Sequence, residues 1–206
     1  MQEKNHNDKT LQTYETKLQE YIKSTPQQIN EAEYPWIDQA LSLIPKGGKI
    51  LELGSGFGRN AEYIQEQGYS IECTDAVQEF VDILQQKGLK AHFLDALKDD
   101  FGSEYDMVFA NGVLVHFTPE ETANVMSKVN TSLKSGGIFA FSVKQGDGSK
   151  WTDEKLGAPR FFHYWQAETL KQLAGAHGFE WVAMLEGKTS LKNASWLYVI
   201  ARKTAK

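Results

Sequence analysis

The stretch from Ile50 to Asn60, Ile-Leu-Glu-Leu-Gly-Ser-Gly-Phe-Gly-Arg-Asn, constrains the fold of this chain more than any other. Its apolar start predicts a short strand, and glycines at alternate positions from Gly54 to Gly58 predict a loop. Glycine reaches positive φ and lets backbone amides approach a ligand closely. A helix predicted over Arg59–Gln67 would aim its free N–H groups at an anionic group. This order of strand, glycine loop and helix indicates a ligand-binding parallel α/β sheet.

Strands and helices alternate along the chain that follows. Strands are predicted over 49–53, 69–74, 90–93, 105–110 and 138–143, and helices over 59–67, 77–87 and 119–133. This alternation indicates parallel strands with helices on both faces of the sheet. After a helix over 166–177, two further strands, Phe179–Glu186 and Ser195–Ala201, are separated by only eight residues. Because so short a connection cannot hold a helical crossover, we expect an antiparallel C-terminal hairpin and an α/β fold with a seven-stranded mixed sheet.

The first 45 residues have a different character. Residues 1–10 are polar, which predicts a disordered tail. Helical spacing then joins five apolar positions, Leu11, Tyr14, Leu18, Tyr21 and Ile22. A second helix is predicted over 28–43, kinked or split by Pro35. We therefore expect one domain over 11–206, with an N-terminal helical cap over 11–45 and the core of the fold over 46–206.

Composition limits the classes of function. The net charge is −5 and the lysines and arginines are dispersed, whereas a nucleic-acid binder usually carries a basic stripe. The longest apolar runs, such as 138–141, are too short to span a bilayer, and residues 1–10 lack the apolar stretch of a secretory signal. One cysteine, Cys73, permits no internal disulfide, and the five histidines lack metal-ligand spacing. These features favour a cytoplasmic protein without a metal, a membrane segment or a nucleic-acid partner.

Two ligand classes use a glycine loop of this kind. A dinucleotide site expects Gly-x-Gly-x-x-Gly, which would place its third glycine at position 59, where Arg59 stands. The pattern Glu-x-Gly-x-Gly-x-Gly, which starts at Glu52, instead resembles the first motif of the class I S-adenosylmethionine-dependent methyltransferase family. A tight turn that binds no ligand is the alternative reading.

The resemblance extends over roughly residues 36–203. Asp75 closes the second strand, where an acid can bind ribose hydroxyls, although it can also cap the helix at Val77. Asp95-Ala96 follows the third strand, residues 105–117 resemble the fourth motif of the family, and residues 133–137 also fit. The resemblance implies a Rossmann-like core and a methyltransferase of the small-molecule, bacterial-like type.

The resemblance also implies S-adenosyl-L-methionine as the cofactor and methylation of a small molecule that the sequence does not identify. It assigns the cofactor to Glu52, Gly54, Ser55, Gly56, Gly58, Asn60, Asp75, Ala76, Asp95, Ala96, Asn111 and Gly112. Tyr14 and Tyr21, seven residues apart on one helical face, either touch the cofactor or pack in the core. The alternative functions are an NAD-dependent oxidoreductase and a non-catalytic module that binds S-adenosylmethionine.

The residues on the side of the methyl acceptor are predicted from their positions in the chain. A general base is needed only where the nucleophile carries a proton, and His116 and His163 are the candidates. Residues 144–165 form a long connection with aromatic residues, which predicts a wall or lid of the acceptor pocket. Its candidate contacts are Lys144, Arg160, Tyr164 and Trp165. The alternative is structural, with a histidine beside the cofactor, aromatic rings over the sheet edge and Arg160 in an ion pair.

Overall fold

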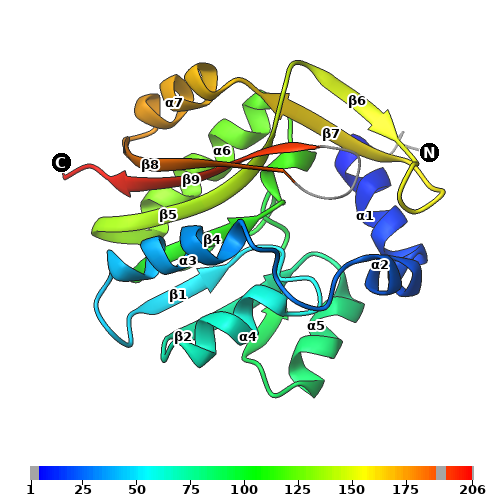
Figure 1. The fold of residues 1–206 in the computed structure, drawn as a ribbon, viewed down its shortest axis with the longest axis horizontal. Coiled ribbons are helices and arrows are strands. Elements are labelled where there is room, and N and C mark those ends of the chain that lie inside the picture. Colours follow the sequence, from blue (N-terminus) through cyan, green and yellow to red (C-terminus); the bar gives the residue numbers. More distant parts are fainter. Residues whose placement is uncertain (1–4, 189–193, 206) are drawn as a thin grey trace.

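The computed structural model describes residues 5–188 and 194–205. Its sheet places five parallel strands in the order β3-β2-β1-β4-β5. These strands are β1 (Lys49–Glu52), β2 (Ser70–Asp75), β3 (Ala91–Phe93), β4 (Tyr105–Asn111) and β5 (Leu133–Gln145). The antiparallel hairpin of β8 (Phe179–Lys188) and β9 (Ser195–Lys203) joins through the pairing of β9 with β5. The predicted mixed sheet of seven strands, with its C-terminal hairpin, is thereby confirmed (Figure 1).

Two further strands extend this sheet within the stretch for which we predicted a connection. β6 (Ser149–Thr152) and β7 (Arg160–Trp165) form an antiparallel hairpin, and β7 pairs in parallel with the end of β5. The aromatic run of β7 suits a strand, because aromatic side chains pack well on a pleated surface. The connection over 144–165 is therefore ordered as a hairpin.

Helices cover both faces of the sheet, as predicted (Figure 1). α3 (Glu33–Ser42) and α4 (Arg59–Glu66) pack on one face, and α6 (Pro119–Ser132) and α7 (Ala167–Ala176) on the other, while α5 (Gln78–Gln86) contacts β2 and β3. Successive strand residues explain the two cores, since Ile50 packs under α3 while Leu51 packs with α6. The predicted start of α6 is confirmed, because Pro119 lies in its first turn and Thr118 and Glu121 form a capping box.

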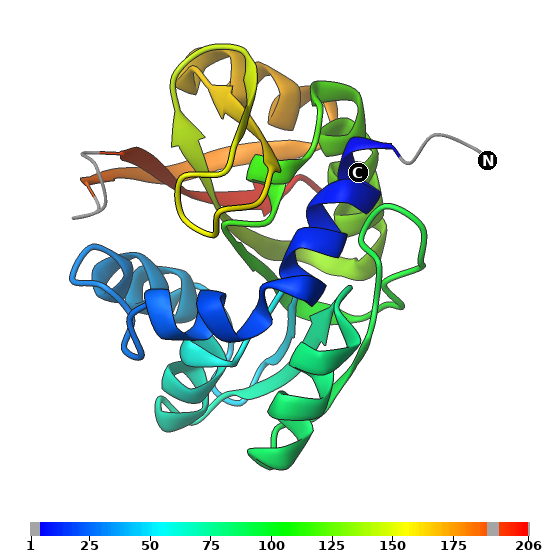
Figure 2. The ribbon, with the colours of Figure 1, turned by 90° about the vertical axis from the view of Figure 1, so that its right-hand side faces the viewer.

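The N-terminal segment differs from its prediction. α1 (His6–Thr16) and α2 (Leu18–Ser24) lie across the carboxyl edge of the parallel strands (Figure 2). Residues 1–4 lie outside the described residues, but residues 6–10 are helical and not a disordered tail. The physical reason is a set of polar contacts with β7 and its approach: Thr10 Oγ1 accepts from Phe161 N at 3.1 Å, and Thr13 Oγ1 donates to Pro159 O at 2.7 Å.

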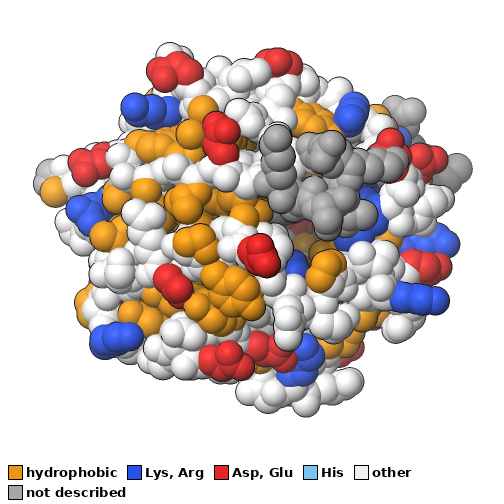
Figure 3. All heavy atoms as spheres, in the orientation of Figure 1, with side chains coloured by type: hydrophobic (Ala, Val, Ile, Leu, Met, Phe, Trp, Pro, Cys, Tyr) orange, Lys and Arg blue, Asp and Glu red, His pale blue; other side chains and the backbone are white. Residues whose placement is uncertain are grey.

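The predicted second helix is also shorter than expected. α3 begins at Glu33, so Pro35 falls in its first turn, where a proline fits without a kink. The short η1 turn (Leu114–His116) follows β4. No helix among residues 5–188 and 194–205 is long and apolar enough to cross a membrane. On the face in Figure 3, the described acidic and basic side chains are interspersed among hydrophobic and neutral ones.

Trp36 packs α3 against the sheet, so its substitution tests how far the core depends on this contact. Its side chain is fully buried, stacks near Phe109 and Tyr198, and donates from Nε1 to Val199 O at 3.1 Å. We expect Trp36→Ala to lower the free energy of unfolding by about 3–5 kcal/mol, the range for truncating a buried Trp. Urea denaturation measures this loss. Trp151→Ala is the control, since Trp151 is 44% exposed; an equal loss in both variants would contradict the assignment of the core.

Candidate functional site

A cavity of about 120 Å³ opens at the carboxyl ends of β1, β2 and β4, beneath α1 and α2. The sheet side of its wall consists of Gly54, Gly56, Asp75, Ala76, Val77, Phe80, Leu94, Asp95, Ala96, Asn111, Gly112, Val113, His116 and Phe117. A smaller hollow of about 40 Å³ adjoins it and adds Ser55, Phe57, Arg59 and Asn60 to the lining. The structure therefore gathers the ends of separate strands around one space, as expected of a parallel α/β sheet.

The glycine loop supplies the floor of this cavity. Gly54 and Gly56 have φ of 63° and 55°, which other residues rarely adopt. A Cβ on Gly54 would meet Val113 Cγ2 at 2.5 Å, whereas the space beside Gly56 is open. Gly54 is thus required for packing, and Gly56 leaves its backbone accessible from the cavity. Gly58 lies outside both hollows, where it caps α4 beside Leu84 and Leu89.

Asp75 joins the loop to the start of α5. Its Oδ2 accepts from Gly56 N and its Oδ1 from Val77 N, each at 2.9 Å. Burial raises the pKa of this carboxyl to about 6, although the backbone donors of Gly56, Val77 and Ala76 oppose the rise. Asp75 lines the cavity and also accepts from the backbone N–H of Val77, directly before α5, so its position is compatible with both predicted roles, and the ribose contact stays a prediction.

Glu52 lies beneath the loop and not at the cavity surface. Its side chain is 1% exposed, and neither carboxylate oxygen has a hydrogen-bond partner among the described residues. Burial raises the pKa of Glu52 to about 7, an effect that the nearby Ser55 and Asn60 side chains offset in part. Asn60 lines the smaller hollow, and its Oδ1 also lacks a partner among the described residues. These orphaned atoms leave polar capacity beside the loop that the described protein groups do not satisfy.

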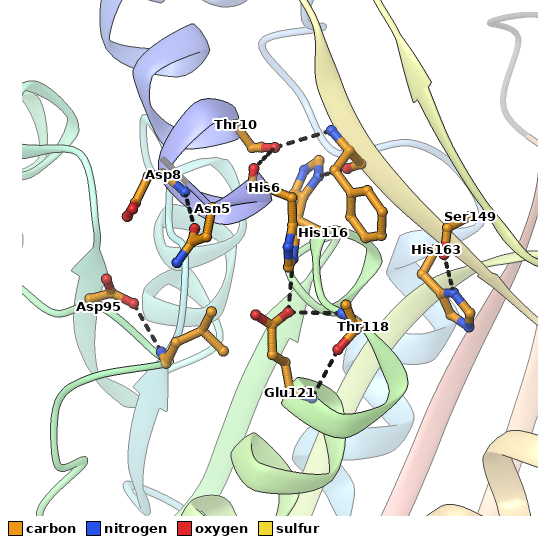
Figure 4. Close-up of polar contacts among 12 residues, drawn as sticks. Asn5, His6, Asp8, Thr10, Asp95, His116, Thr118, Glu121, Ser149 and His163 are labelled. Atoms are coloured by element: carbon orange, nitrogen blue, oxygen red, sulfur yellow. Dashed lines mark hydrogen bonds and ion pairs between the residues drawn. The ribbon is translucent and has the colours of Figure 1, made fainter. Parts of the chain in front are cut away.

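The remaining predicted cofactor residues surround the cavity. Asp95 and Ala96 line it, with Asp95 Oδ1 accepting from Leu97 N at 2.9 Å (Figure 4). At the opposite end, Asn111 Oδ1 accepts from Ser142 Oγ at 2.6 Å, and Asn111 Nδ2 donates to Glu33 Oε1 at 3.1 Å. Our sequence analysis missed Glu33 because an acid in the first turn of a helix is an ordinary surface residue in a sequence. Only the fold brings its carboxylate to the end of β4.

The N-terminal helices α1 and α2 cover the cavity and form its roof. Asn7, Thr10, Leu11, Tyr14 and Tyr21 line the cavity from α1 and α2. Both tyrosines therefore face the cavity, although they also pack with each other and with Phe57 and Phe80. Asn7 and Thr10 were missed because we assigned them to a tail. A signal was present, since Asn5 accepts from Asp8 N as a helix N-cap, and Asn followed three residues later by an acid is a helix-start pattern.

His116 is held in a buried network beneath this roof. Its Nδ1 lies 2.7 Å from Phe161 O and its Nε2 2.9 Å from Tyr14 Oη. A carbonyl only accepts, so Nδ1 donates and Nε2 accepts from Tyr14. Arg160 NH1 in turn donates to Tyr14 Oη at 3.1 Å. Burial lowers the pKa of His116 to about 3, so the ring is neutral and both of its nitrogens are engaged.

The acceptor candidates divide between the two faces of β7. Arg160 and Tyr164 share one face with Lys144, whose Nζ lies 5.8 Å from the Tyr164 ring centroid. Trp165 is buried in the core, and His163 contacts it on the other face. Figure 4 shows His163 bonded to Ser149, apart from His116. The structure thus places Lys144, Arg160 and Tyr164 on one face of the β5–β7 pair, where Arg160 bonds to Tyr14 of the cavity wall, and turns His163 and Trp165 to the other face. None of these five side chains lines the cavity itself.

The cavity offers surfaces for an elongated ligand with a flat ring and a polar tail. Val77, Phe80 and Leu94 form apolar walls near the Asp75 carboxylate, which can accept from hydroxyl groups. At the other end of the cavity, Gly54 and Asn111 contribute polar backbone groups. Among residues 5–188 and 194–205, no group of three or more His, Cys, Asp or Glu side chains is placed to hold a metal ion.

Comparisons with known proteins point to one family. The sequence profile described as a methyltransferase domain matches residues 21–184. An uncharacterized methyltransferase of Synechocystis is 31% identical over 100 residues, which are 47% of this chain and 47% of that protein. The sarcosine/dimethylglycine N-methyltransferase of Aphanothece halophytica is 28% identical over 108 residues, which are 48% of this chain and 38% of that protein. The matches thus span about half or less of these curated relatives.

A solved structure shares the fold. The 1,6-didemethyltoxoflavin-N1-methyltransferase of Burkholderia thailandensis superimposes with a TM-score of 0.70 at 22% identity, over 85% of this chain and 79% of that chain. That crystal structure holds 1,6-didemethyltoxoflavin and S-adenosylhomocysteine.

The unpaired Glu52 carboxyl predicts a dependence of stability on pH. Because its folded-state pKa is raised from 4.5 to about 7, the folded protein retains a proton that the unfolded chain releases, so stability falls as pH rises through this window. We expect Glu52→Gln to gain about 3 kcal/mol relative to wild type between about pH 4.5 and about pH 8. Chemical denaturation along a pH series measures this difference. The exposed Glu66→Gln is the matched control, and a wild-type profile that parallels Glu52→Gln would rule out the raised pKa.

Proposed function

Because the chain belongs to the methyltransferase domain family, we propose that it transfers a methyl group from S-adenosylmethionine to a small-molecule acceptor. The observation that carries this proposal is the cavity formed by Gly54, Gly56, Asp75, Asp95 and Asn111 at the carboxyl ends of neighbouring strands. Its backbone amides, acidic end and apolar walls suit a nucleoside joined to an amino-acid tail.

The residues of the cavity would each have a distinct part in holding this cofactor. Asp75 would accept from ribose hydroxyls with the lone pairs that Gly56 and Val77 leave free. Ala76, Val77, Asp95 and Ala96 would enclose the adenine. The open backbone at Gly56 and the polar end at Asn111 and Gly112 would hold the tail. When bound, the sulfonium supplies an electrophilic methyl group, and this chain's residues orient it.

The buried network favours a positioning role for His116 over a role as general base. Its Nε2 lone pair is engaged by Tyr14, and a pKa of about 3 makes it a weak base. His116 fixes Tyr14 instead, so the phenol oxygen stays at the cavity wall. His163, which bonds Ser149 on the β6–β7 hairpin, lacks access to the cavity in this conformation. A nucleophile that reaches the site already deprotonated would need neither histidine.

A small acceptor is supported by the relatives as well as by the shape of the site. One relative is named for sarcosine and dimethylglycine, and the Burkholderia structure holds 1,6-didemethyltoxoflavin. All three are small molecules. The roof of α1 and α2 narrows access to the cavity, which suits such an acceptor better than a polymer.

Two rival functions have direct tests. An NAD-dependent oxidoreductase is disfavoured by Arg59, which occupies the position of the third glycine. Thermal shifts with S-adenosylhomocysteine and with NAD separate the two, because a ligand that binds only the folded state raises the melting temperature. A module that binds the cofactor without turnover would bind S-adenosylhomocysteine yet release none from S-adenosylmethionine across an acceptor screen.

Asp75 gives a quantitative test of the cofactor site. We expect Asp75→Ala to weaken S-adenosylhomocysteine binding by about 1–3 kcal/mol, because hydrogen bonds to a charged group are lost and the loop is released. Isothermal titration calorimetry measures the change. Asp82→Ala, which removes an exposed acid from α5, is the matched control. Equal affinities in wild type and Asp75→Ala would reduce Asp75 to a cap of the backbone at Val77.

A further inference from the structure

Four cationic side chains converge beside the cavity. Lys155 Nζ lies 4.5 Å above the Tyr21 ring, Arg160 NH1 donates to Tyr14 Oη, and Arg59 lines the smaller hollow with Tyr21. Lys144, on the neighbouring strand, is close enough to Arg160 and Lys155 for their charges to repel. These cations come from α4, β5, the β6–β7 connection and β7, so the sequence, which singles out Lys144 and Arg160, does not show that Arg59 and Lys155 join them.

The cations lack acidic partners. Among the described residues, no carboxylate lies within ion-pair distance of Lys144, Lys155 or Arg160, although Glu154 favours the charge of Lys144 from further away. Arg160 is only 5% exposed, and its Nε has no hydrogen-bond partner among those residues. Burial, then the neighbouring cations, lowers the pKa of Lys144 and of Lys155 to about 8. Arg160 is buried, whereas Lys144 and Lys155 are partly exposed, and Lys155 Nζ donates to Thr25 Oγ1 at 2.7 Å. Cations gathered at buried and partly buried positions without a counter-charge are costly, which indicates that a ligand of opposite charge completes the cluster.

Aromatic rings lie beside these cations. Lys144 Nζ lies 3.7 Å from the Phe162 ring centroid and 5.8 Å from those of Tyr164 and Trp196. The Trp196 ring also lies close to the backbone of Gly112, a residue of the cavity wall, so these rings adjoin the polar end of the cavity. Flat apolar walls beside cations suit a planar acid.

We propose that Lys144, Lys155 and Arg160 bind an acidic group of the methyl acceptor, a carboxylate or a phosphate, with its planar body against Tyr164 and Trp196. This inference rests on the proposed function and adds the chemical class of the acceptor. The cofactor's own carboxylate is the other source of the same chemistry, so a test has to separate the two.

The experiment uses the full chain saturated with S-adenosylhomocysteine. Benzoate, phenyl phosphate and neutral benzamide are titrated in turn by calorimetry. We expect benzoate or phenyl phosphate to bind at least about tenfold more tightly than benzamide, as the loss of one charged contact predicts. Lys144→Met should weaken binding of the acid by about tenfold while affinity for S-adenosylhomocysteine stays at the wild-type value. The exposed Lys171→Met on α7 is the matched control and should bind both ligands as wild type does.

Lys144→Met is a suitable variant because the Lys144 side chain makes no hydrogen bond among the described residues, and Met retains contact with the rings. Its melting temperature should equal or exceed that of wild type, since an unpaired, partly buried cation is removed. Equal binding of acids and benzamide, no binding of either acid, or acid binding unchanged by Lys144→Met would overturn the inference. A loss of S-adenosylhomocysteine affinity in Lys144→Met would assign the cluster to the cofactor. Failure of wild type to bind S-adenosylhomocysteine would contradict the proposed function itself.

Discussion

The Asp75 carboxylate holds together the parts of the molecule on which the cavity depends. It accepts one hydrogen bond from Gly56 N in the glycine loop after β1 and another from Val77 N, between β2 and α5. Because these segments belong to neighbouring parallel strands, their separation is fixed by the sheet, and the carboxylate fixes their orientation. Gly54 and Gly56 take positive φ within this restrained loop, and the space beside Gly56 is open.

The sequence predicts most of the core because the relevant signals are local. The glycine loop, Pro119 in the first turn of α6 and the antiparallel pairing of β8 with β9 each follow from signals within a few residues, and each forms where predicted. The helical start of α1 at residues 6–10 and the β6–β7 hairpin were not predicted, because they stabilise each other across the chain. Thr10 and Thr13 look like solvent-facing residues in a sequence, but they bond to backbone groups about 150 residues away.

The residues of the candidate site divide in the same way, into those that local signals predict and those that depend on packing between distant segments. Strand-end residues such as Asp95 and Asn111 were predicted, since the carboxyl ends of parallel strands share one edge. Glu33, Asn7 and Lys155 were not, because their place depends on how the roof and the hairpin pack. His163 and Trp165 were assigned by proximity to Arg160, but strand alternation turns them to the opposite face. A period-two reading of 160–165 would have separated the two sets.

Tyr14 links the cavity, where we propose that the cofactor binds, to the cluster of Lys144, Lys155 and Arg160, where we propose that the acceptor binds. A transfer reaction requires these two sites to be adjacent. Its ring lines the cavity, while its hydroxyl accepts a hydrogen bond from Arg160 and donates one to His116. The hydroxyl therefore has a defined direction only while Arg160 is charged and His116 is neutral. Burial secures the second condition, and the permanent charge of a guanidinium secures the first. Since Arg160 belongs to β7 and Tyr14 to α1, docking of the roof onto the hairpin completes this wall. The position of α1 thus determines the cavity and the basic cluster together.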